Sequence, residues 1–372
     1  MYQPPLPAEY VSLSESETHE RIQAARQVLG SRLVILGHHY QRDDIIRYAD
    51  YRGDSYKLCR DAASRPEADY IVFCGVHFMA ESADMLSADH QIVILPNLSA
   101  GCSMADMANT FQVRQAWRQL EEVTDIARVV PITYMNSAAA LKAFVGERGG
   151  AVCTSSNASK VLSWALGQGD KVLFFPDQHL GRNTAVRMGF DVDRDMLVWD
   201  PNQPFGGNVP ERIREATFLL WKGHCSVHMR FTLEQVRLAR KVHPGINVVV
   251  HPECTKDVVD AADSFGSTEF IIKTVTAGAP GTKWAIGTEI NLVKRLADEN
   301  PDKLIFCLDP ITCPCSTMYR IHPSFLLWVL ENLVAGRVVN RIEVPPQTKR
   351  HALQALQRMV AITEQSVTAS AV

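Results

Sequence analysis

The sequence has no C-x-x-C motif, although it contains nine cysteines among its 372 residues. Zinc ribbons and many iron–sulfur proteins take two ligands from one such motif. The three-cysteine run that supports radical chemistry with S-adenosylmethionine is missing as well. The longest apolar run near the C-terminus, residues 325–334, includes Glu331 and Asn332 and is too short to span a bilayer. These absences exclude the common cysteine motifs and predict no membrane-spanning helix.

The chain also lacks a large excess of charge of either sign, because 38 Lys and Arg residues nearly balance 41 Asp and Glu residues. The net charge of −3 gives no electrostatic reason to expect nucleic acid or an anionic membrane as a partner. The N-terminal segment lacks a basic stretch followed by an apolar one, so no signal peptide is indicated. Nine cysteines in such a chain argue against a disulfide framework. We expect a cytoplasmic protein that binds neither nucleic acid nor membrane.

Short apolar runs rich in valine and isoleucine alternate with amphipathic segments along the chain. Such runs are typical of buried parallel strands. The predicted strands are 32–37, 69–74, 91–96, 127–133, 151–154, 171–175, 196–199, 246–251, 283–287 and 303–308. The predicted helices include 14–29, 112–122, 159–167, 233–242 and 289–299. This alternation predicts an α/β fold with parallel sheets and right-handed crossovers.

The chain is longer than a usual single domain. Its predicted strands fall into groups of three, four and three, which divides the sequence into domains at 1–118, 119–235 and 236–345. A C-terminal helix and tail follow at 346–372. An irregular loop at 201–210 interrupts the middle group.

One pattern occurs three times: a polar residue at the end of an apolar run, a hydroxyl residue opening a predicted helix, and a later cysteine. The three sets are His38, Ser55 and Cys102, then Tyr134, Ser155 and Cys225, then His251, Thr268 and Cys315. The separations are 17 and 47 residues in both the first and the last set, and 21 and 70 in the middle one. Two matching intervals indicate an internal threefold repeat.

Each copy places its cysteine in a loop that contains glycine or proline, in Gly101-Cys102-Ser103, Gly223-His224-Cys225 and Pro314-Cys315-Ser316. Three thiolates meeting on a threefold axis match three corners of a cubane cluster. The fourth iron would then be open to substrate as a Lewis acid. The alternative is that these are unrelated loop cysteines. By contrast, Cys74, Cys153 and Cys307 lie in or at the end of predicted strands, where a small buried side chain is the better interpretation.

Polar residues at the carboxyl ends of the predicted strands are His38, Tyr134, Asn136, His251 and Glu253. In open α/β sheets these ends face the ligand crevice. Glu253 is the sole carboxylate of the set and the natural general base. Taken singly, each of these residues is more often a structural polar group.

The hydroxyl residues Ser55, Ser155 and Thr268 have two interpretations. They could simply cap helices, which serine and threonine favour. They could also bind anionic groups, because free N–H groups and the helix dipole attract carboxylate or phosphate. Two further motifs, Phe175-Pro176-Asp177 and Gly287-Thr288-Glu289, are conspicuous but receive no assigned role.

At these residues the chain resembles the quinolinate synthase family, over about residues 30–340. The resemblance is carried by Gly37-His38-His39-Tyr40-Gln41, Pro96-Asn97-Leu98-Ser99-Ala100-Gly101-Cys102, Tyr134-Met135-Asn136, Thr154-Ser155, Trp221-Lys222-Gly223-His224-Cys225, His251-Pro252-Glu253-Cys254 and Gly287-Thr288-Glu289. It implies three Rossmann-like αβα sandwich domains with parallel sheets, related by pseudo-threefold symmetry around a central active site. That fold agrees with the internal repeat.

The resemblance also implies a reaction of de novo NAD biosynthesis. Iminosuccinate (iminoaspartate) condenses with dihydroxyacetone phosphate to give quinolinate, phosphate and water, with one 4Fe–4S cluster as Lewis acid. The implied cluster ligands are Cys102, Cys225 and Cys315, which leave one iron open. Cys313, two residues before Cys315, is the alternative third ligand; the 17-and-47 spacing favours Cys315.

The implied substrate-binding residues are His38, Ser55, Tyr134, Asn136, Ser155, His251, Glu253 and Thr268. Proton transfer would fall to Glu253, with Tyr40 and Tyr134 as further catalytic candidates. Iminosuccinate hydrolyses easily, so we expect water to be excluded from the pocket. A transient contact with the enzyme that supplies iminosuccinate is a further expectation.

Two other functions fit the same cysteine pattern. One is a different 4Fe–4S hydro-lyase acting on a small hydroxy acid. The other is a non-catalytic iron–sulfur sensor or scaffold, which would need an output surface such as a basic helix or an extra domain. The sequence contains neither.

Overall fold

The computed structural model describes residues 2–311 and 314–369, with side chains as far as residue 364. These residues form two compact units. Unit 1 comprises the described residues of Met1–Cys102, Glu289–Arg295 and Cys313–Val344, and unit 2 comprises those of Ser103–Thr288, Leu296–Thr312 and Pro345–Val372. Within the described residues, no helix combines the length and the apolar character needed to cross a membrane.

Unit 1 is built on a five-stranded sheet with the order β14-β4-β3-β1-β2. The strands are β1 (Leu33–His38), β2 (Tyr51–Gly53), β3 (Tyr70–Cys74), β4 (Ile92–Ile94) and β14 (Arg341–Ile342). The first four run parallel, and β14 pairs antiparallel with β4 at the edge. Every residue of β1 is buried, as expected for a central parallel strand covered on both faces.

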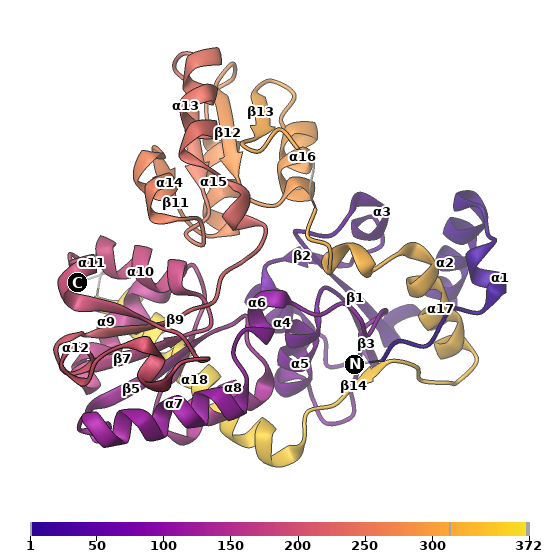
Figure 1. The fold of residues 1–372 in the computed structure, drawn as a ribbon. Helices are drawn as coiled ribbons and strands as arrows, with labels where there is room; N and C mark the ends of the chain where they lie inside the picture. The colour runs from indigo at the N-terminus through magenta and orange to yellow at the C-terminus, as the bar shows by residue number, and fades with distance from the viewer. Residues whose placement is uncertain (1, 312–313, 370–372) are drawn as a thin grey trace. The chain divides into compact units, whose positions relative to one another are not determined.

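The helices of unit 1 are α1 (Ala8–Val11), α2 (Glu15–Leu29), α3 (Asp43–Ile46), α4 (Ser55–Ala63), α5 (His77–Leu86) and α17 (Pro323–Val334), with 3-10 turns at Gly30–Arg32 and Met318–Arg320. A capping box formed by Ser14 and Glu17 starts α2. In Figure 1, α2 lies beside α17, with which it packs, and α4 packs against α5. Unit 1 also includes the first part of α16 (Ile290–Glu299).

The first sheet of unit 2 has five parallel strands in the order β6-β5-β7-β9-β8. These are β5 (Val129–Tyr134), β6 (Ala151–Cys153), β7 (Lys171–Phe175), β8 (Met196–Trp199) and β9 (Phe218–Trp221). Its helices are α6 (Ser103–Asp106), α7 (Thr110–Val123), α8 (Ala139–Glu147), α9 (Ala158–Gln168), α10 (Gln178–Arg187), α11 (Val192–Asp195) and α12 (Pro210–Glu215), with 3-10 turns at Ile126–Arg128 and Pro204–Gly207. Figure 1 shows α9 and α10 on one face of this sheet, and α7 and α8 on the other.

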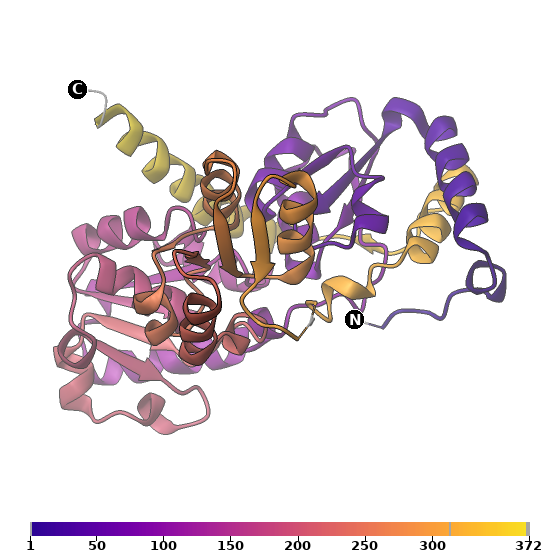
Figure 2. The same ribbon diagram turned by 90° about the horizontal axis from the view of Figure 1, so that it is seen from above.

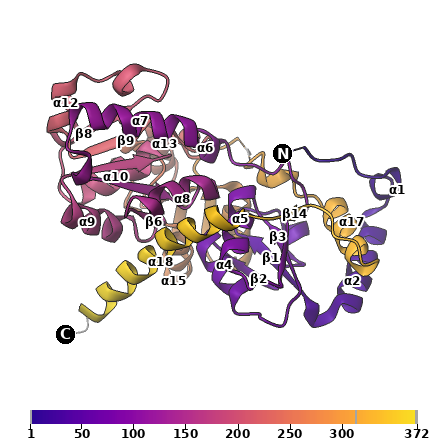
Figure 3. The same ribbon diagram turned by 90° about the horizontal axis from the view of Figure 1, so that it is seen from below.

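The C-terminal helix α18 (Pro346–Ala369) packs along α8, as Figure 3 shows. Gly146 of α8 makes this close contact feasible. A Cβ atom at this position would lie 1.9 Å from the carbonyl oxygen of His351. Only glycine therefore fits at the crossing of the two helices.

The second sheet of unit 2 has four parallel strands in the order β11-β10-β12-β13. They are β10 (Asn247–Val250), β11 (Ser264–Phe265), β12 (Lys283–Gly287) and β13 (Leu304–Cys307). The accompanying helices are α13 (Leu233–Val242), α14 (Lys256–Ala261), α15 (Thr268–Ala277) and the end of α16, with a 3-10 turn at His228–Arg230. Figure 2 shows the orange strands of this sheet with helices at either side.

The same strand order occurs in all three sheets. Each contains a four-strand series in which the first strand of the group is flanked by the second and the third: β2-β1-β3-β4, β6-β5-β7-β9 and β11-β10-β12-β13. The predicted α/β class with three Rossmann-like parallel-sheet αβα domains is therefore confirmed. The domain boundaries and the pseudo-threefold arrangement around one centre remain predictions.

All ten predicted strands occur, each end within two residues of its prediction, but β2, β9, β11 and β14 were not predicted. Three of these four contain only two or three residues, too short for a periodicity to be recognised. The fourth, β9, is a central strand whose four residues are all fully buried. In the middle copy, β8 and α12 are inserted between α10 and β9, so the longer spacing reflects an added strand as well as the 201–210 loop.

Candidate active site

Glu253 lies in the turn after β10 and is only 2% exposed. Its Oε2 atom is 2.8 Å from Nδ1 of His228, and the Tyr134 hydroxyl also hydrogen-bonds this carboxylate. On the far side of the imidazole, Nε2 of His228 is 3.3 Å from the Thr288 hydroxyl. These four residues belong to unit 2 and lie at or beyond strand ends. A buried carboxylate held by an imidazole and a phenol is an arrangement suited to proton transfer.

The surroundings of Glu253 favour its ionised form. Burial opposes ionisation, but the imidazoles of His251 and His228 and the hydrogen bonds from His228 and Tyr134 outweigh it and lower the pKa of Glu253 to about 2. Burial also lowers the pKa of His251 to about 3, so that this imidazole is neutral at neutral pH. The rings of His251 and His228 are stacked with centroids 4.5 Å apart. The site thus combines an ionised carboxylate with a neutral imidazole.

Cys225 brings a thiol to this carboxylate. Its Sγ atom, a His228 ring nitrogen and a Glu253 oxygen all lie within 4.8 Å of one another, and such a group can hold a metal ion. Cys225 is half-buried, and thiolate is the soft ligand that iron–sulfur clusters and zinc prefer. The Glu253 carboxylate, in contrast, already accepts hydrogen bonds from His228 and Tyr134. This donor set fits a thiolate-bound metal with a base beside it.

A second carboxyl group, that of Asp177, interacts electrostatically with Glu253. Its Oδ1 accepts from the backbone N–H groups of His179 and Leu180 at 2.7 and 2.9 Å and so caps α10. Its Oδ2 is buried and has no hydrogen-bond partner among the described residues. Burial, and then the nearby Glu253 carboxylate, raise the pKa of Asp177 well above its usual value. The two environments therefore push the two carboxyl groups towards opposite protonation states.

The same helix fixes the turn that carries Glu253. Asn183 of α10 donates from Nδ2 to the carbonyl oxygens of Pro252 and Cys254, at 2.9 and 2.8 Å. These two carbonyl groups flank Glu253 in sequence. The backbone of the catalytic candidate is thus held from both sides.

The raised pKa of Asp177 favours its protonated form and predicts that Asp177→Asn will be tolerated. Asparagine keeps the α10 cap and introduces no charge, so the midpoint of anaerobic thermal unfolding should stay close to that of the unchanged protein. Asp177→Ala removes the cap and should cost about 1 kcal/mol of folding free energy. Equal destabilisation by both changes would mean that the carboxylate form is required.

In unit 1 the predicted residues gather after β1. His38 is the last residue of β1 and is buried, and its Nδ1 accepts from the Tyr40 N–H at 3.1 Å. Burial lowers the pKa of His38 to about 3, so the neutral ring carries its proton on Nε2 and can donate it to a ligand. The rings of His38 and Tyr40 meet edge to face, with centroids 4.9 Å apart.

Two of the three predicted ligand loops are tied together inside unit 1. Asn97 donates from Nδ2 to the carbonyl oxygen of Arg320 at 3.0 Å, and Arg320 donates from Nη1 to the carbonyl oxygen of Ser99 at 3.1 Å. These bonds join the loop that ends at Cys102 to the loop that begins at Cys315. Both thiols are half-buried.

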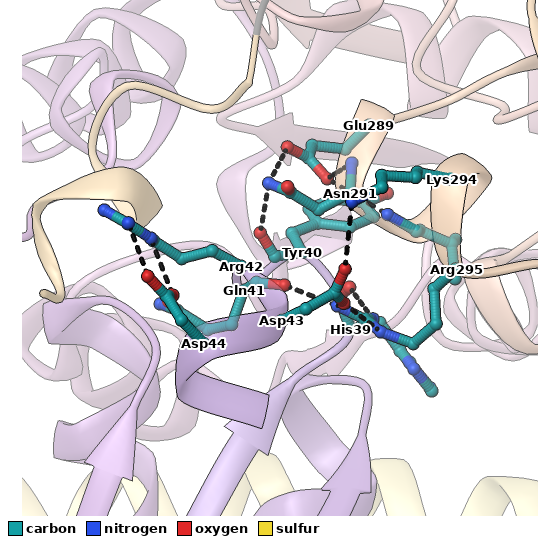
Figure 4. Close-up of polar contacts among 11 residues, drawn as sticks. His39, Tyr40, Gln41, Arg42, Asp43, Asp44, Glu289, Asn291, Lys294 and Arg295 are labelled. Carbon is teal, nitrogen blue, oxygen red and sulfur yellow. Dashed lines mark hydrogen bonds and ion pairs between the residues drawn. The ribbon is translucent and has the colours of Figure 1, made fainter. Parts of the chain in front are cut away.

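Glu289 supports the second of these loops. It is fully buried, and its Oε1 accepts from the Cys315 N–H at 3.2 Å. Burial raises the pKa of Glu289 to about 7, although backbone N–H groups oppose that rise. Figure 4 shows Glu289 beside Asn291 and Tyr40.

The hydroxyl residues are not the caps of their helices. Ser55 and Thr268 are the first residues of α4 and α15, and the caps are the preceding residues Asp54 and Ser267. Ser155 lies in the turn before α9, whose N-cap residue is Asn157. The capping interpretation therefore does not account for these three hydroxyls.

Each hydroxyl follows the strand that pairs with the polar strand end of its own copy. His38 pairs with Gly53, Tyr134 with Cys153, and Val250, the residue before His251, with Phe265. Asn136 follows Tyr134 on the same turn and is half-buried. The polar residue and the hydroxyl of each set thus lie at neighbouring strand ends, as the repeat predicts.

The remaining cysteines fall into clear classes. Cys313 lies outside the described residues. Cys254 is fully buried, and its thiol is 3.7 Å from the carbonyl oxygen of Gly287; burial raises its pKa well above the usual value. Cys74 and Cys153 are fully buried in strands, as predicted, whereas Cys307 is only half-buried.

The predicted residues of unit 2 lie together near the carboxyl ends of strands, as the sequence indicated. They are Tyr134, His251, Glu253 and Cys225. The meeting of the unit 1 and unit 2 residues at one centre remains a prediction. Sequence reasoning missed His228, which lies three residues after Cys225, and it gave no role to Asp177 or Glu289. The available signal for these two was a carboxylate directly after a strand, the same signal that identified Glu253.

Comparison with known proteins gives one consistent match. The family described as Quinolinate synthetase A protein matches residues 20–361. A quinolinate synthase of Corynebacterium glutamicum is 58% identical over 357 residues, covering 96% of this chain and 90% of the relative. Those of Nocardioides sp. and Herpetosiphon aurantiacus are 56% and 57% identical, covering 97% and 95% of this chain and 93% and 95% of the relatives.

Proposed function

The chain belongs to the quinolinate synthase family, and we propose that it condenses iminosuccinate with dihydroxyacetone phosphate to give quinolinate, phosphate and water. The observation that carries this proposal is the group in unit 2 where the Cys225 thiol lies within 4.8 Å of Glu253 and His228. A base directly beside a metal-binding thiol suits a reaction that combines proton removal with loss of hydroxide and phosphate. The relatives in the comparison bear the same enzyme name.

We propose Cys102, Cys225 and Cys315 as ligands of one 4Fe–4S cluster. The donor chemistry fits, because three half-buried thiols lie on loops and no C-x-x-C motif competes for the metal. When bound, such a cluster would supply an open iron that acts as a Lewis acid on a substrate oxygen. Cys313 remains the alternative third ligand.

The protein residues would move the protons. The ionised Glu253 carboxylate would remove a proton from the substrate carbon or imine nitrogen. His228 donates from Nδ1 to that carboxylate at 2.8 Å and would hold it in place while it takes up the proton. Tyr134, which hydrogen-bonds Glu253, and Tyr40 are the candidates for returning protons to the leaving oxygen atoms.

The remaining predicted residues would bind the anionic groups of the substrates. The neutral imidazoles of His38 and His251 can donate hydrogen bonds without adding charge. Ser55, Ser155 and Thr268 lie at or just before helix starts, where N–H groups favour carboxylate and phosphate. Asn136 adds an amide next to Tyr134. Because free iminosuccinate hydrolyses, we further propose a transient contact with the enzyme that supplies it.

The group around Cys225 favours one competing assignment, a mononuclear zinc site. A cysteine, a histidine and a glutamate are zinc ligands, and a catalytic zinc needs three such protein ligands. Anaerobically reconstituted protein should contain iron and sulfide in equal amounts if the cluster is correct. Zinc without sulfide would support the competing site.

The experiment that tests the function is an anaerobic assay with both substrates, followed by detection of quinolinate. We expect quinolinate to form. Added quinolinate should inhibit competitively and perturb the spectrum of a single iron, because its vicinal carboxylates can displace water from the open position. Exposure to air should remove the visible absorbance and the activity together. A cluster that is stable in air and whose spectrum does not change with quinolinate would contradict the open iron and favour a sensor. Turnover of a simple hydroxy acid alone would favour another hydro-lyase.

A further inference from the structure

Three consecutive backbone carbonyl groups, those of His39, Tyr40 and Gln41, accept hydrogen bonds from side chains of α16 (Figure 4). Arg295 donates from Nη1 to His39 at 2.9 Å and from Nη2 to Gln41 at 2.6 Å. Asn291 donates from Nδ2 to Tyr40 at 3.3 Å. All five residues belong to unit 1. Hydrogen bonds to three carbonyl groups therefore hold the turn that carries Tyr40, and their donors lie on α16, which is distant in sequence.

Arg295 is suited to this contact because its guanidinium group presents several donors in a fixed plane. Its side chain is 8% exposed, and Nε donates to Oδ1 of Asp43 at 2.9 Å. One buried group thus spans three acceptors on the segment from His39 to Asp43. A lysine would retain the charge but could not reach these acceptors with the same geometry.

Glu289, the residue immediately before α16, makes two different sets of contacts. Its Oε2 accepts from the N–H groups of Asn291 and Leu292 at 2.8 and 3.4 Å, which is an ordinary helix cap. Its Oε1 accepts from Nδ2 of Asn291 at 2.9 Å and from the Cys315 N–H at 3.2 Å. The second set reaches beyond the helix to the cysteine loop. Because Asn291 also donates to Tyr40, a continuous chain of hydrogen bonds runs from Cys315 to Tyr40.

A purely structural interpretation would assign a cap to Glu289 and a buried ion pair to Arg295. That interpretation does not explain why the contacts outside the helix converge on the backbone of two loops, one carrying Tyr40 and the other Cys315. Residues that orient metal ligands and catalytic groups through hydrogen bonds typically change metal affinity or activity by about 10-fold to 100-fold when replaced. The contacts of α16 have this character.

We propose that Glu289, Asn291 and Arg295 form one positioning element, which sets the Tyr40 turn and the Cys315 loop relative to each other. The proposal rests on the proposed function, since it assigns the two loops to substrate and cluster. The proposal gives the three residues no contact with substrate or metal. They act through the backbone of the loops they hold.

The first test separates the Tyr40 turn from the cluster loop. Arg295→Lys should lower kcat/KM by about 10-fold to 100-fold, while iron and sulfide contents stay unchanged. Hydrogen exchange of the amides at residues 39–42 should accelerate in this variant. Lys294→Ala is the matched control. Lys294 immediately precedes Arg295 on the helix, and its Nζ lies 3.5 Å from the same Asp43. In the described structure it contacts none of the three carbonyl groups. It should behave like the unchanged protein.

The second test addresses the Cys315 loop. In Glu289→Gln one carboxylate oxygen becomes an NH₂ group. This group cannot accept a hydrogen bond, so either the Cys315 N–H or the helix N–H groups lose their acceptor. Iron release to a chelator under anaerobic conditions should accelerate by about 10-fold to 100-fold, and hydrogen exchange at residues 315–318 should increase. Glu289→Asp, a shorter carboxylate, can keep the cap but should not restore the reach to Cys315.

The two tests distinguish failure of this inference from failure of the proposed function. If the unchanged protein makes no quinolinate, the function is wrong, and the exchange measurements still decide whether α16 holds the two loops. If Arg295→Lys and Lys294→Ala have equal effects, the element has only a structural role. The same holds if the loss of kcat/KM in each variant is proportional to its loss of thermal stability. Unchanged exchange at both loops would overturn the inference directly.

Discussion

Cys225→Ala is expected to yield a protein that contains little iron, lacks visible absorbance and has no measurable turnover. If the three proposed thiolates hold a cluster, loss of one leaves it with two protein ligands, and the affinity of a metal site depends on the full set. In the described structure the Cys225 thiol lies within 4.8 Å of Glu253. The change should therefore remove the metal from the position where the base acts. Iron and sulfide analysis after anaerobic reconstitution measures the effect.

Cys74→Ala is the appropriate control for this experiment. Cys74 is fully buried in β3, and burial raises its pKa to about 12, so it remains a protonated thiol rather than a metal ligand. Its variant should keep the full iron content. A Cys225→Ala protein with normal iron content would contradict the assignment of Cys225 as a cluster ligand.

The same measurement decides between Cys315 and Cys313 as the third ligand. Cys315→Ala should lose iron if the repeat spacing identifies the ligand correctly. Full iron content in Cys315→Ala together with loss in Cys313→Ala would transfer the role to Cys313.

The fold could be predicted from the sequence because its strands are short buried runs that end abruptly. The 32–37 run became β1, where all six residues are buried, and the polar residue after it, His38, closes the strand. The pattern failed at β9, where Phe218–Trp221 is only four residues long and follows the polar segment of α12. Four apolar residues do not by themselves separate a strand from the end of a helix, although the equally short run at 196–199 was predicted correctly. That omission hid the element that leads to Cys225.

The residues of the candidate site could be singled out from the sequence only where they lie at a strand end. Glu253 and Tyr134 were found because each directly follows or ends an apolar run. His228 was missed because it lies in a 3-10 turn, and its importance depends on Glu253, 25 residues later in the chain. The role of Arg295 depends on carbonyl groups more than 250 residues away. Such pairings are set by the packing of distant segments, which local periodicity does not report.

Glu253→Gln is expected to reduce turnover by about 10²-fold to 10⁴-fold while the cluster remains intact. Glutamine preserves the size of the side chain and an acceptor for His228, but it cannot take up a proton. A carboxylate with a pKa lowered to about 2 is ionised at every pH well above that value, so turnover should fall on the acidic side only as Glu253 becomes protonated. The acidic limb of the kcat/KM profile should therefore disappear in Glu253→Gln, and His228→Gln should shift it while leaving some activity. The pH profiles, recorded with iron content measured on the same samples, test this assignment. Turnover near that of the unchanged protein, with normal iron content, would remove Glu253 from the mechanism and move the search for the base to Tyr40.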